Sequence, residues 1–194
     1  MRYYTIYNDG LLIADNQEAL RRYYNTPIFE LPEDYEEGKY IIGEVEEKIE
    51  VIDYDEEGNP IGSHTEILTV KKLIPNPNWD EEQAEKREAD FKSKFFEIQG
   101  FGWYRKQPKG YTSAVESLNT AFNAVTIMQK LPAGMLIFYQ APDFTKPEEC
   151  TEEWLIAHQT FNNEMTAQEF GAFYVGFMTA WNNQEHVSEE ENDA

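Results

Sequence analysis

Two prolines in three positions, within Ile74-Pro75-Asn76-Pro77-Asn78, constrain the possible fold more than any other feature of the sequence. Proline blocks both helix continuation and strand pairing, so neither kind of element is expected to run through this segment. Runs of β-branched and aromatic residues precede it, whereas Glu, Ala, Lys and Arg follow it, with apolar residues at helical spacing. We therefore predict an α+β protein with a β-rich region at 1–74, a Pro/Asn linker at 75–79 and a helical region at 80–184.

The β-rich region is expected to contain a hairpin. Its arms are predicted at 48–54 and 61–73, joined by the acidic turn Asp55-Glu56-Glu57-Gly58-Asn59-Pro60. Strands are also predicted at 3–7, 11–13 and 39–45. Between them, a short helix is expected at 15–24 with Asp15 as its N-cap, because Glu18 follows three residues later.

The helical region is expected to contain about four helices and one strand. The first helix is predicted at 80–99, where Gly100 would end it. Two capping boxes, Ser113 to Glu116 and Thr166 to Glu169, predict the starts of the second and fourth helices, and the third begins near Thr151. A buried strand is predicted at 135–139. The final segment, 185–194, holds five acidic residues and no Lys or Arg, which predicts a disordered acidic tail.

The charge balance limits the partners that the chain can bind. It has 37 acidic and 16 basic residues and a formal net charge of −21. Such a chain is repelled by nucleic acids and by anionic membranes, so binding to either is not expected. No apolar run is long enough to cross a bilayer. The simplest interpretation of the charge is solubility, and the alternatives are docking on a basic partner or mimicry of a nucleic acid.

No motif in the sequence predicts catalysis, a metal site or a cofactor. Cys150 and His158 would lie roughly 12 Å apart on one helix, which is too far for a nucleophile–base pair. The acidic turn at 53–58 resembles the start of a calcium loop, but His64 occupies the position where that loop requires Glu. We therefore predict a protein that is not an enzyme.

One segment runs against the acidic composition. Residues 86–109 contain seven Lys or Arg and three acidic residues, interleaved with aromatic side chains. Arg together with Trp and Tyr is typical of protein interfaces, because rigid rings bury much area at low entropic cost. Single-stranded nucleic acid and a plain packing role for the rings are the alternatives. The predicted interface residues are Lys92, Lys94, Trp103, Tyr104, Arg105, Lys106, Lys109 and Tyr111.

Residues 53–91 resemble a junction found in small bacteriophage and prophage tail-region proteins. The resemblance lies in the hairpin tip Asp-Glu-Glu-Gly-Asn-Pro-Ile-Gly, the Pro/Asn linker, and the charged helix that begins Trp-Asp-Glu-Glu-Gln-Ala-Glu-Lys-Arg. It implies a virion component or an assembly factor, present in the host cytoplasm during assembly and, for a structural component, in the virion. It identifies no functional residues.

Two functional hypotheses follow. The first is a non-enzymatic, virion-associated or assembly protein that binds phage structural proteins or forms homo-oligomers through the basic segment. A molecule with one basic patch on an otherwise acidic surface is suited to head-to-tail contacts. The second is an acidic mimic of DNA that inhibits a host nucleic-acid enzyme, and it would require the carboxylates to form one continuous ridge.

Overall fold

The computed structural model describes residues 1–21 and 26–190, with 35% helix and 33% strand. Strands dominate the first part of the chain and helices the second, which confirms the predicted α+β class. The chain divides into two compact units, Met1–Trp79 and Asp80–Ala194. This division falls at the end of the segment 75–79 that the two prolines mark as a linker.

The first unit contains a small antiparallel sheet in the order β2-β1-β3. Its strands are β1 (Tyr3–Tyr7), β2 (Gly10–Ala14) and β3 (Phe29–Glu30), and α1 (Gln17–Leu20) follows β2. The N-cap of α1 is Asn16, whose side chain accepts a hydrogen bond from Ala19 N at 2.9 Å. The prediction of Asp15 as the cap is therefore wrong by one residue. The end of that predicted helix, 22–25, lies outside the described residues.

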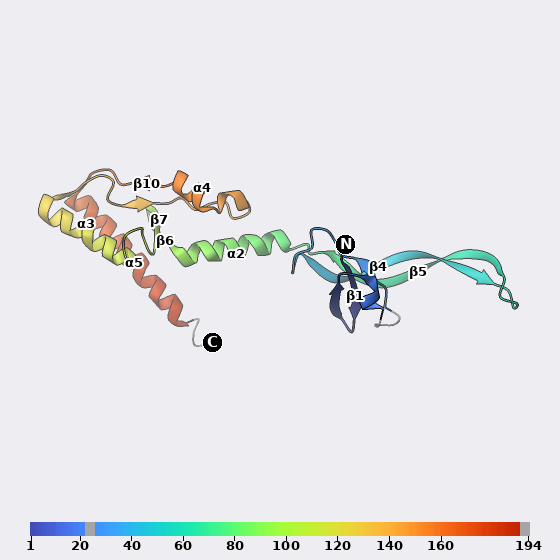
Figure 1. The fold of residues 1–194 in the computed structure, drawn as a ribbon. Coiled ribbons are helices and arrows are strands. Elements are labelled where there is room, and N and C mark those ends of the chain that lie inside the picture. The colour runs from blue at the N-terminus through green and yellow to red at the C-terminus, as the bar shows by residue number, and fades with distance from the viewer. Residues whose placement is uncertain (22–25, 191–194) are drawn as a thin grey trace. The chain divides into compact units, whose positions relative to one another are not determined.

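A long two-stranded antiparallel ribbon makes up the rest of the first unit. It consists of β4 (Tyr40–Tyr54) and β5 (Pro60–Pro75), and Figure 1 shows it extending beyond the small sheet of its own unit. The prediction of two separate elements at 39–45 and 48–54 is wrong, because β4 passes through Glu46 and Glu47 without a break. Residues 60–69 of β5 are all exposed, so this part of the ribbon tolerates charged residues that a buried strand would not.

The second unit begins with α2 (Trp79–Lys94) and a hairpin of β6 (Phe95–Ile98) and β7 (Gly102–Arg105). The predicted helix at 80–99 is therefore too long. Phe95, Phe96 and Ile98 are buried, and as a strand they pair with β7 while packing into the core. Gly100, with a φ of +83°, belongs to the hairpin turn and not to a helix end.

The remaining elements alternate short strands with helices. In order, they are α3 (Ala114–Met128), β8 (Lys130–Leu131), β9 (Ile137–Phe138), η1 (Pro147–Glu149), α4 (Glu152–Ala157), β10 (Thr160–Phe161), β11 (Met165–Thr166) and α5 (Ala167–Glu190). The described part of this unit thus contains six short strands where the sequence predicts one. Strands of two residues are too short to produce a detectable alternation of apolar and polar residues.

Both predicted capping boxes lie at helix starts. Ser113 caps α3, and Thr166 and Glu169 exchange hydrogen bonds at the start of α5. Phe170, Phe173 and Phe177 of α5 are buried in the main core of the unit, so this aromatic face packs inward. The α5 backbone stays helical through Glu190, six residues into the segment predicted as a disordered tail. Residues 191–194 of that segment lie outside the described residues.

Candidate functional site

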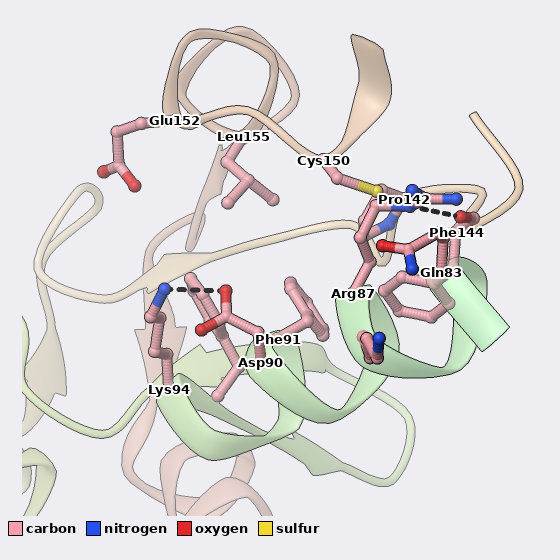
Figure 2. A pocket seen from close by; sticks show the side chains of 12 residues that line it. Gln83, Arg87, Asp90, Phe91, Lys94, Pro142, Phe144, Cys150, Glu152 and Leu155 are labelled. Carbon is pink, nitrogen blue, oxygen red and sulfur yellow. Dashed lines mark hydrogen bonds and ion pairs between the residues drawn. The ribbon is translucent and has the colours of Figure 1, made fainter. Parts of the chain in front are cut away.

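A cleft in the second unit lies between α2 and the segment 142–155, and Figure 2 shows the side chains around it. Its volume is about 420 Å³, within the range of pockets that hold small ligands or an inserted side chain. We call it the cationic cleft. It is lined by Gln83, Lys86, Arg87, Asp90, Phe91, Lys94, Phe95, Pro142, Phe144, Cys150, Glu152 and Leu155.

The aromatic floor of the cationic cleft lies where α2 passes into β6. Phe91 in the last turn of α2 and Phe95 at the start of β6 stack with ring centroids 4.5 Å apart. Phe144 lies 5.6 Å from the Phe91 ring, and buried Leu155 belongs to the same cluster. The Nε of Arg87 donates a hydrogen bond to the backbone oxygen of Phe144 at 2.8 Å, which ties α2 to the opposite wall.

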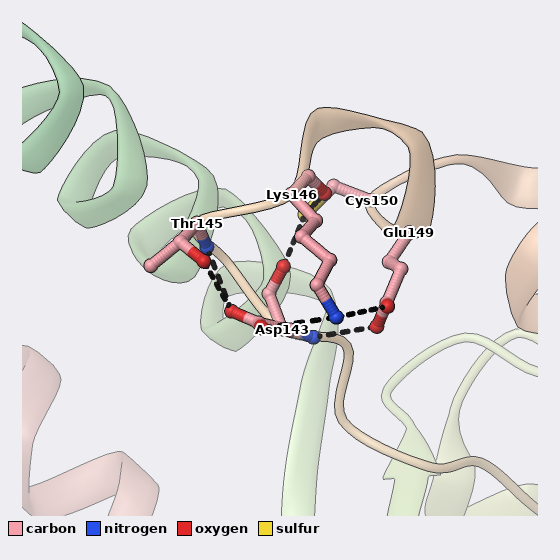
Figure 3. A network of polar contacts seen from close by, with 5 residues as sticks. All are labelled: Asp143, Thr145, Lys146, Glu149 and Cys150. Atoms are coloured by element: carbon pink, nitrogen blue, oxygen red, sulfur yellow. Dashed lines mark hydrogen bonds and ion pairs between the residues drawn. The ribbon is translucent and has the colours of Figure 1, made fainter.

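The loop that forms this opposite wall is held by its own polar contacts, shown in Figure 3. The Asp143 carboxylate accepts hydrogen bonds from the backbone N and hydroxyl of Thr145 at 3.1 and 2.7 Å. Lys146 bridges Asp143 and Glu149 at 3.3 and 2.9 Å. The hydrogen bonds from Thr145 lower the pKa of Asp143, so it stays ionised near neutral pH. These contacts fix the conformation of the wall.

Cys150 lines the cationic cleft but lacks the surroundings of a reactive cysteine. Its Sγ donates to the backbone oxygen of Lys146 at 3.5 Å, and burial raises the pKa of the thiol. His158 lies at the far end of α4, where Nδ1 is 2.8 Å from the Trp154 oxygen and the ring stacks on the Trp154 indole. The two side chains thus have separate partners.

Two of the predicted interface residues belong to the interior. Tyr104 is only 2% exposed, and its hydroxyl hydrogen-bonds the buried Ser117 hydroxyl at 2.7 Å. It is a core residue, and its assignment to a contact surface is wrong. Trp103, on the other face of β7, is half-buried against Phe91 with ring centroids 5.0 Å apart. In a sequence, an aromatic residue of the core is indistinguishable from one at an interface.

Arg105 acts as a clamp within the unit. Its guanidinium donates twice to the Glu152 carboxylate, at 2.7 and 2.6 Å, and lies 5.0 Å from the centroid of the Phe95 ring. These contacts join β7, α4 and the start of β6. Glu152 is therefore already neutralised where it borders the cationic cleft, and the cations of α2 dominate that rim.

The other predicted basic residues lie on the surface around α2. Lys94 pairs with Asp90 and Lys92 with Glu88, in each case four residues apart on the helix. Lys106 and Lys109 form no ion pair among the described residues. Lys106 is half-buried, and this burial lowers its pKa. The exposed Lys94–Asp90 and Lys92–Glu88 ion pairs each contribute about 0–1 kcal/mol to stability, so they can rearrange when a partner binds.

The structure brings three of the predicted residues together beside the cationic cleft. Lys94, Arg105 and Lys106 line an adjoining hollow of about 530 Å³ that shares Lys94 and Glu152 with it. Lys109 and Tyr111 border a smaller hollow of about 70 Å³, which Arg105 also lines. Lys92 and Trp103 line a further hollow together with Lys106. The predicted interface residues are therefore spread over neighbouring hollows that share Arg105 or Lys106.

Many of the residues that line the cationic cleft lie outside the basic segment 86–109 and could not be predicted from it. Pro142, Phe144, Cys150, Glu152 and Leu155 follow α2 by about fifty residues or more and carry no shared motif. They reach the cleft because the β9 region pairs with β7, where Trp103 N and Tyr139 N each donate to the other's backbone oxygen at 3.1 and 2.8 Å. This long-range pairing, together with the Arg87–Phe144 and Arg105–Glu152 contacts, places segment 142–155 over α2.

Within the described residues, no group of His, Cys, Asp and Glu side chains has the arrangement of a metal site. In the same part of the chain, no helix is both long enough and apolar enough to span a membrane. No protein-family model matches the sequence, and neither the curated proteins nor the solved structures contain a significant match.

Proposed function

We propose that the chain is a non-enzymatic assembly protein that acts through protein–protein contacts and associates with copies of itself. The observation that carries this proposal is the cationic cleft, a preformed pocket with an aromatic floor on a strongly acidic chain. Together with the adjoining hollow it presents five cations, Lys86, Arg87, Lys94, Arg105 and Lys106, against the two carboxylates Asp90 and Glu152.

The chemistry of the cationic cleft favours an acidic protein segment with an apolar anchor. Phe91, Phe95 and Leu155 are at most 7% exposed, so only their small exposed edges in the cleft floor can contact an apolar side chain, at about 25 cal/mol for each Å² buried. The surrounding Lys and Arg side chains attract carboxylates and repel cationic partners. Most of the chain's own surface is acidic, so a second copy is a suitable source of such a segment.

The only thiol in the cationic cleft, that of Cys150, is not placed to act as a catalytic nucleophile. The Cys150 thiol stays protonated because burial raises its pKa, and it is bonded to a backbone oxygen and not to a base. The setting that we propose, a bacteriophage virion or its assembly in the host cytoplasm, is the one implied by the resemblance of residues 53–91 to phage tail-region proteins.

The test is light scattering coupled to size exclusion, at about 50 mM and about 500 mM salt, because salt screens exposed charges. We expect an oligomer in low salt that dissociates in high salt. A protein that stays monomeric at high micromolar concentration in low salt contradicts self-association.

Lys94→Glu and Lys130→Glu form a matched pair for this experiment. Both lysines are largely exposed, both pair with one carboxylate at 2.7 Å, and both substitutions change the charge by the same amount. Only Lys94 lines the cationic cleft. Lys94→Glu is expected to weaken association about tenfold or more, equivalent to about 1.4 kcal/mol, whereas Lys130→Glu leaves it near the wild-type value. If both substitutions weakened association equally, the cationic cleft would not be part of the interface.

A further inference from the structure

The distal part of the ribbon in the first unit is acidic. Residues 49–70 contain no Lys or Arg and six carboxylates: Glu50, Asp53, Asp55, Glu56, Glu57 and Glu66. We call residues 53–61 the ribbon tip. Two apolar side chains at this end are exposed, Ile61 to 68% and Ile52 to 51%. The ribbon tip thus combines negative charge with an apolar side chain that has no cover in its own unit.

The ribbon tip is held in one conformation by Asp55. Its Oδ1 accepts hydrogen bonds from Glu57 N and Asn59 N at 2.9 and 2.8 Å, and its Oδ2 accepts one from Asn59 Nδ2 at 3.2 Å. Gly58 supplies the positive φ, +86°, that closes the turn. A preformed turn loses little conformational entropy on binding. Glu56 and Glu57 form no ion pair among the described residues, which leaves their carboxylates available to a partner.

We propose that the ribbon tip of one copy docks in the cationic cleft of a second copy. This inference rests on the proposed self-association through the cationic cleft and names the segment that occupies it. The carboxylates of Glu56 and Glu57 would face the Lys86 and Lys94 ammonium groups. The Ile61 side chain would enter the aromatic floor at Phe91.

The ribbon also overcomes the mutual repulsion of two chains that each carry a net charge of −21. The pairs Glu46–Thr69 and Asp53–Gly62 lie seven residues apart along each strand, which corresponds to roughly 23 Å at about 3.3 Å for each residue. That reach is about three times the Debye length of about 8 Å at physiological salt. The bulk of one unit therefore stays screened from the partner while only the ribbon tip enters the cleft.

A contact between two different surfaces, ribbon tip and cationic cleft, is heterologous. Each copy then keeps one unused tip and one unused cleft, so the assembly closes into a ring or extends as a filament. This property separates the proposal from a two-fold dimer, in which the same surface is used twice.

The experiment uses two full-length variants, each defective on one side of the proposed contact. Glu56→Lys/Glu57→Lys reverses the charge of two side chains in the ribbon tip and keeps Asp55, which shapes the turn. Glu36→Lys/Glu37→Lys is the control, because it reverses two adjacent exposed glutamates of the same unit and changes the net charge equally. In low salt, the tip variant is expected to associate at least tenfold more weakly than the control, as seen by sedimentation or light scattering.

Mixing the tip variant with Lys94→Glu provides the decisive measurement. Each variant alone is expected to be monomeric, but the mixture retains one intact tip and one intact cleft. It should therefore form a one-to-one dimer and nothing larger. If the tip variant assembles as well as the control, or if the mixture forms no dimer, the inference is overturned. The effect of Lys94→Glu alone then still decides whether the cationic cleft mediates self-association.

Discussion

Asn162→Ala tests how the turn that precedes β9 is held. Asn162 is only 5% exposed, and its side chain forms three hydrogen bonds, two of them to the turn between β8 and β9. Its Nδ2 donates to the backbone oxygens of Pro132 and Asn163 at 2.9 and 2.7 Å, and its Oδ1 accepts from Leu136 N at 2.8 Å. Leu136 is fully buried, so its amide cannot be satisfied by water if Asn162 is removed.

The expected loss is about 3 kcal/mol. Each hydrogen bond contributes about 1 kcal/mol net, and leaving a buried N–H without an acceptor costs about 1–3 kcal/mol. These contributions overlap at Leu136, so their plain sum would exceed the real loss. With a urea dependence of about 2 kcal/mol per molar, the unfolding midpoint falls by about 1.5 M.

Urea unfolding followed by tryptophan fluorescence is the appropriate assay, because Trp103, Trp154 and Trp181 all lie in the second unit. Asn163→Ala is the matched control. It removes the same side chain from the neighbouring exposed position and is expected to change stability by no more than about 0.5 kcal/mol. If Asn162→Ala cost less than about 1 kcal/mol, or the same as the control, the network would not hold this turn.

Three further measurements address individual side chains. Tyr104→Phe and Ser117→Ala should each cost about 1–2 kcal/mol, and because they remove the same buried hydrogen bond, the double variant should cost clearly less than their sum; strict additivity would contradict this. Hydrogen bonds to the carboxylates of Glu66 and Asp53 raise the pKa of His64 above its ordinary 6.5. Its contribution to stability is therefore complete below pH 6.5 and is lost as the pH rises through the raised value; an NMR titration midpoint at or below 6.5 would refute the interaction. Burial raises the pKa of Cys150, so iodoacetamide should alkylate it more slowly at pH 8 than it alkylates free cysteine, and an equal or faster rate would show an activated thiol.

Local signals in the sequence located the helix starts well. The side chains of Ser113, Thr151 and Thr166 each accept a hydrogen bond from the backbone N–H three residues later. Such a helix cap depends only on a few neighbouring residues, so it can be predicted from the local sequence. The linker prolines act in the same local way. The acidic turn at the end of the ribbon was likewise predictable, because Asp, Gly and Asn each have a specific role in closing it.

The failures concern elements whose stability depends on distant residues. The predicted first helix continued into Phe95–Ile98, which has adequate helix propensity but gains more as a strand paired with β7 in the core. Tyr104 was assigned to a surface for the same reason, since only the fold shows that Ser117 lies beneath it. The cationic cleft was half predictable. Its α2 side carries the basic segment, whereas Phe144 and Leu155 arrive through tertiary pairing.

The ribbon has a consequence for handling the protein at high salt. Among the described residues no third strand pairs with β4 or β5, so both outer edges present backbone groups that can recruit further strands. At neutral pH, mutual repulsion among the carboxylates of neighbouring ribbons opposes such stacking. High salt screens this repulsion, and the exposed Ile61, Ile67 and Leu68 side chains are then left without that protection. The same negative charges that fit the ribbon tip for a cationic partner therefore also guard the chain against fibril formation.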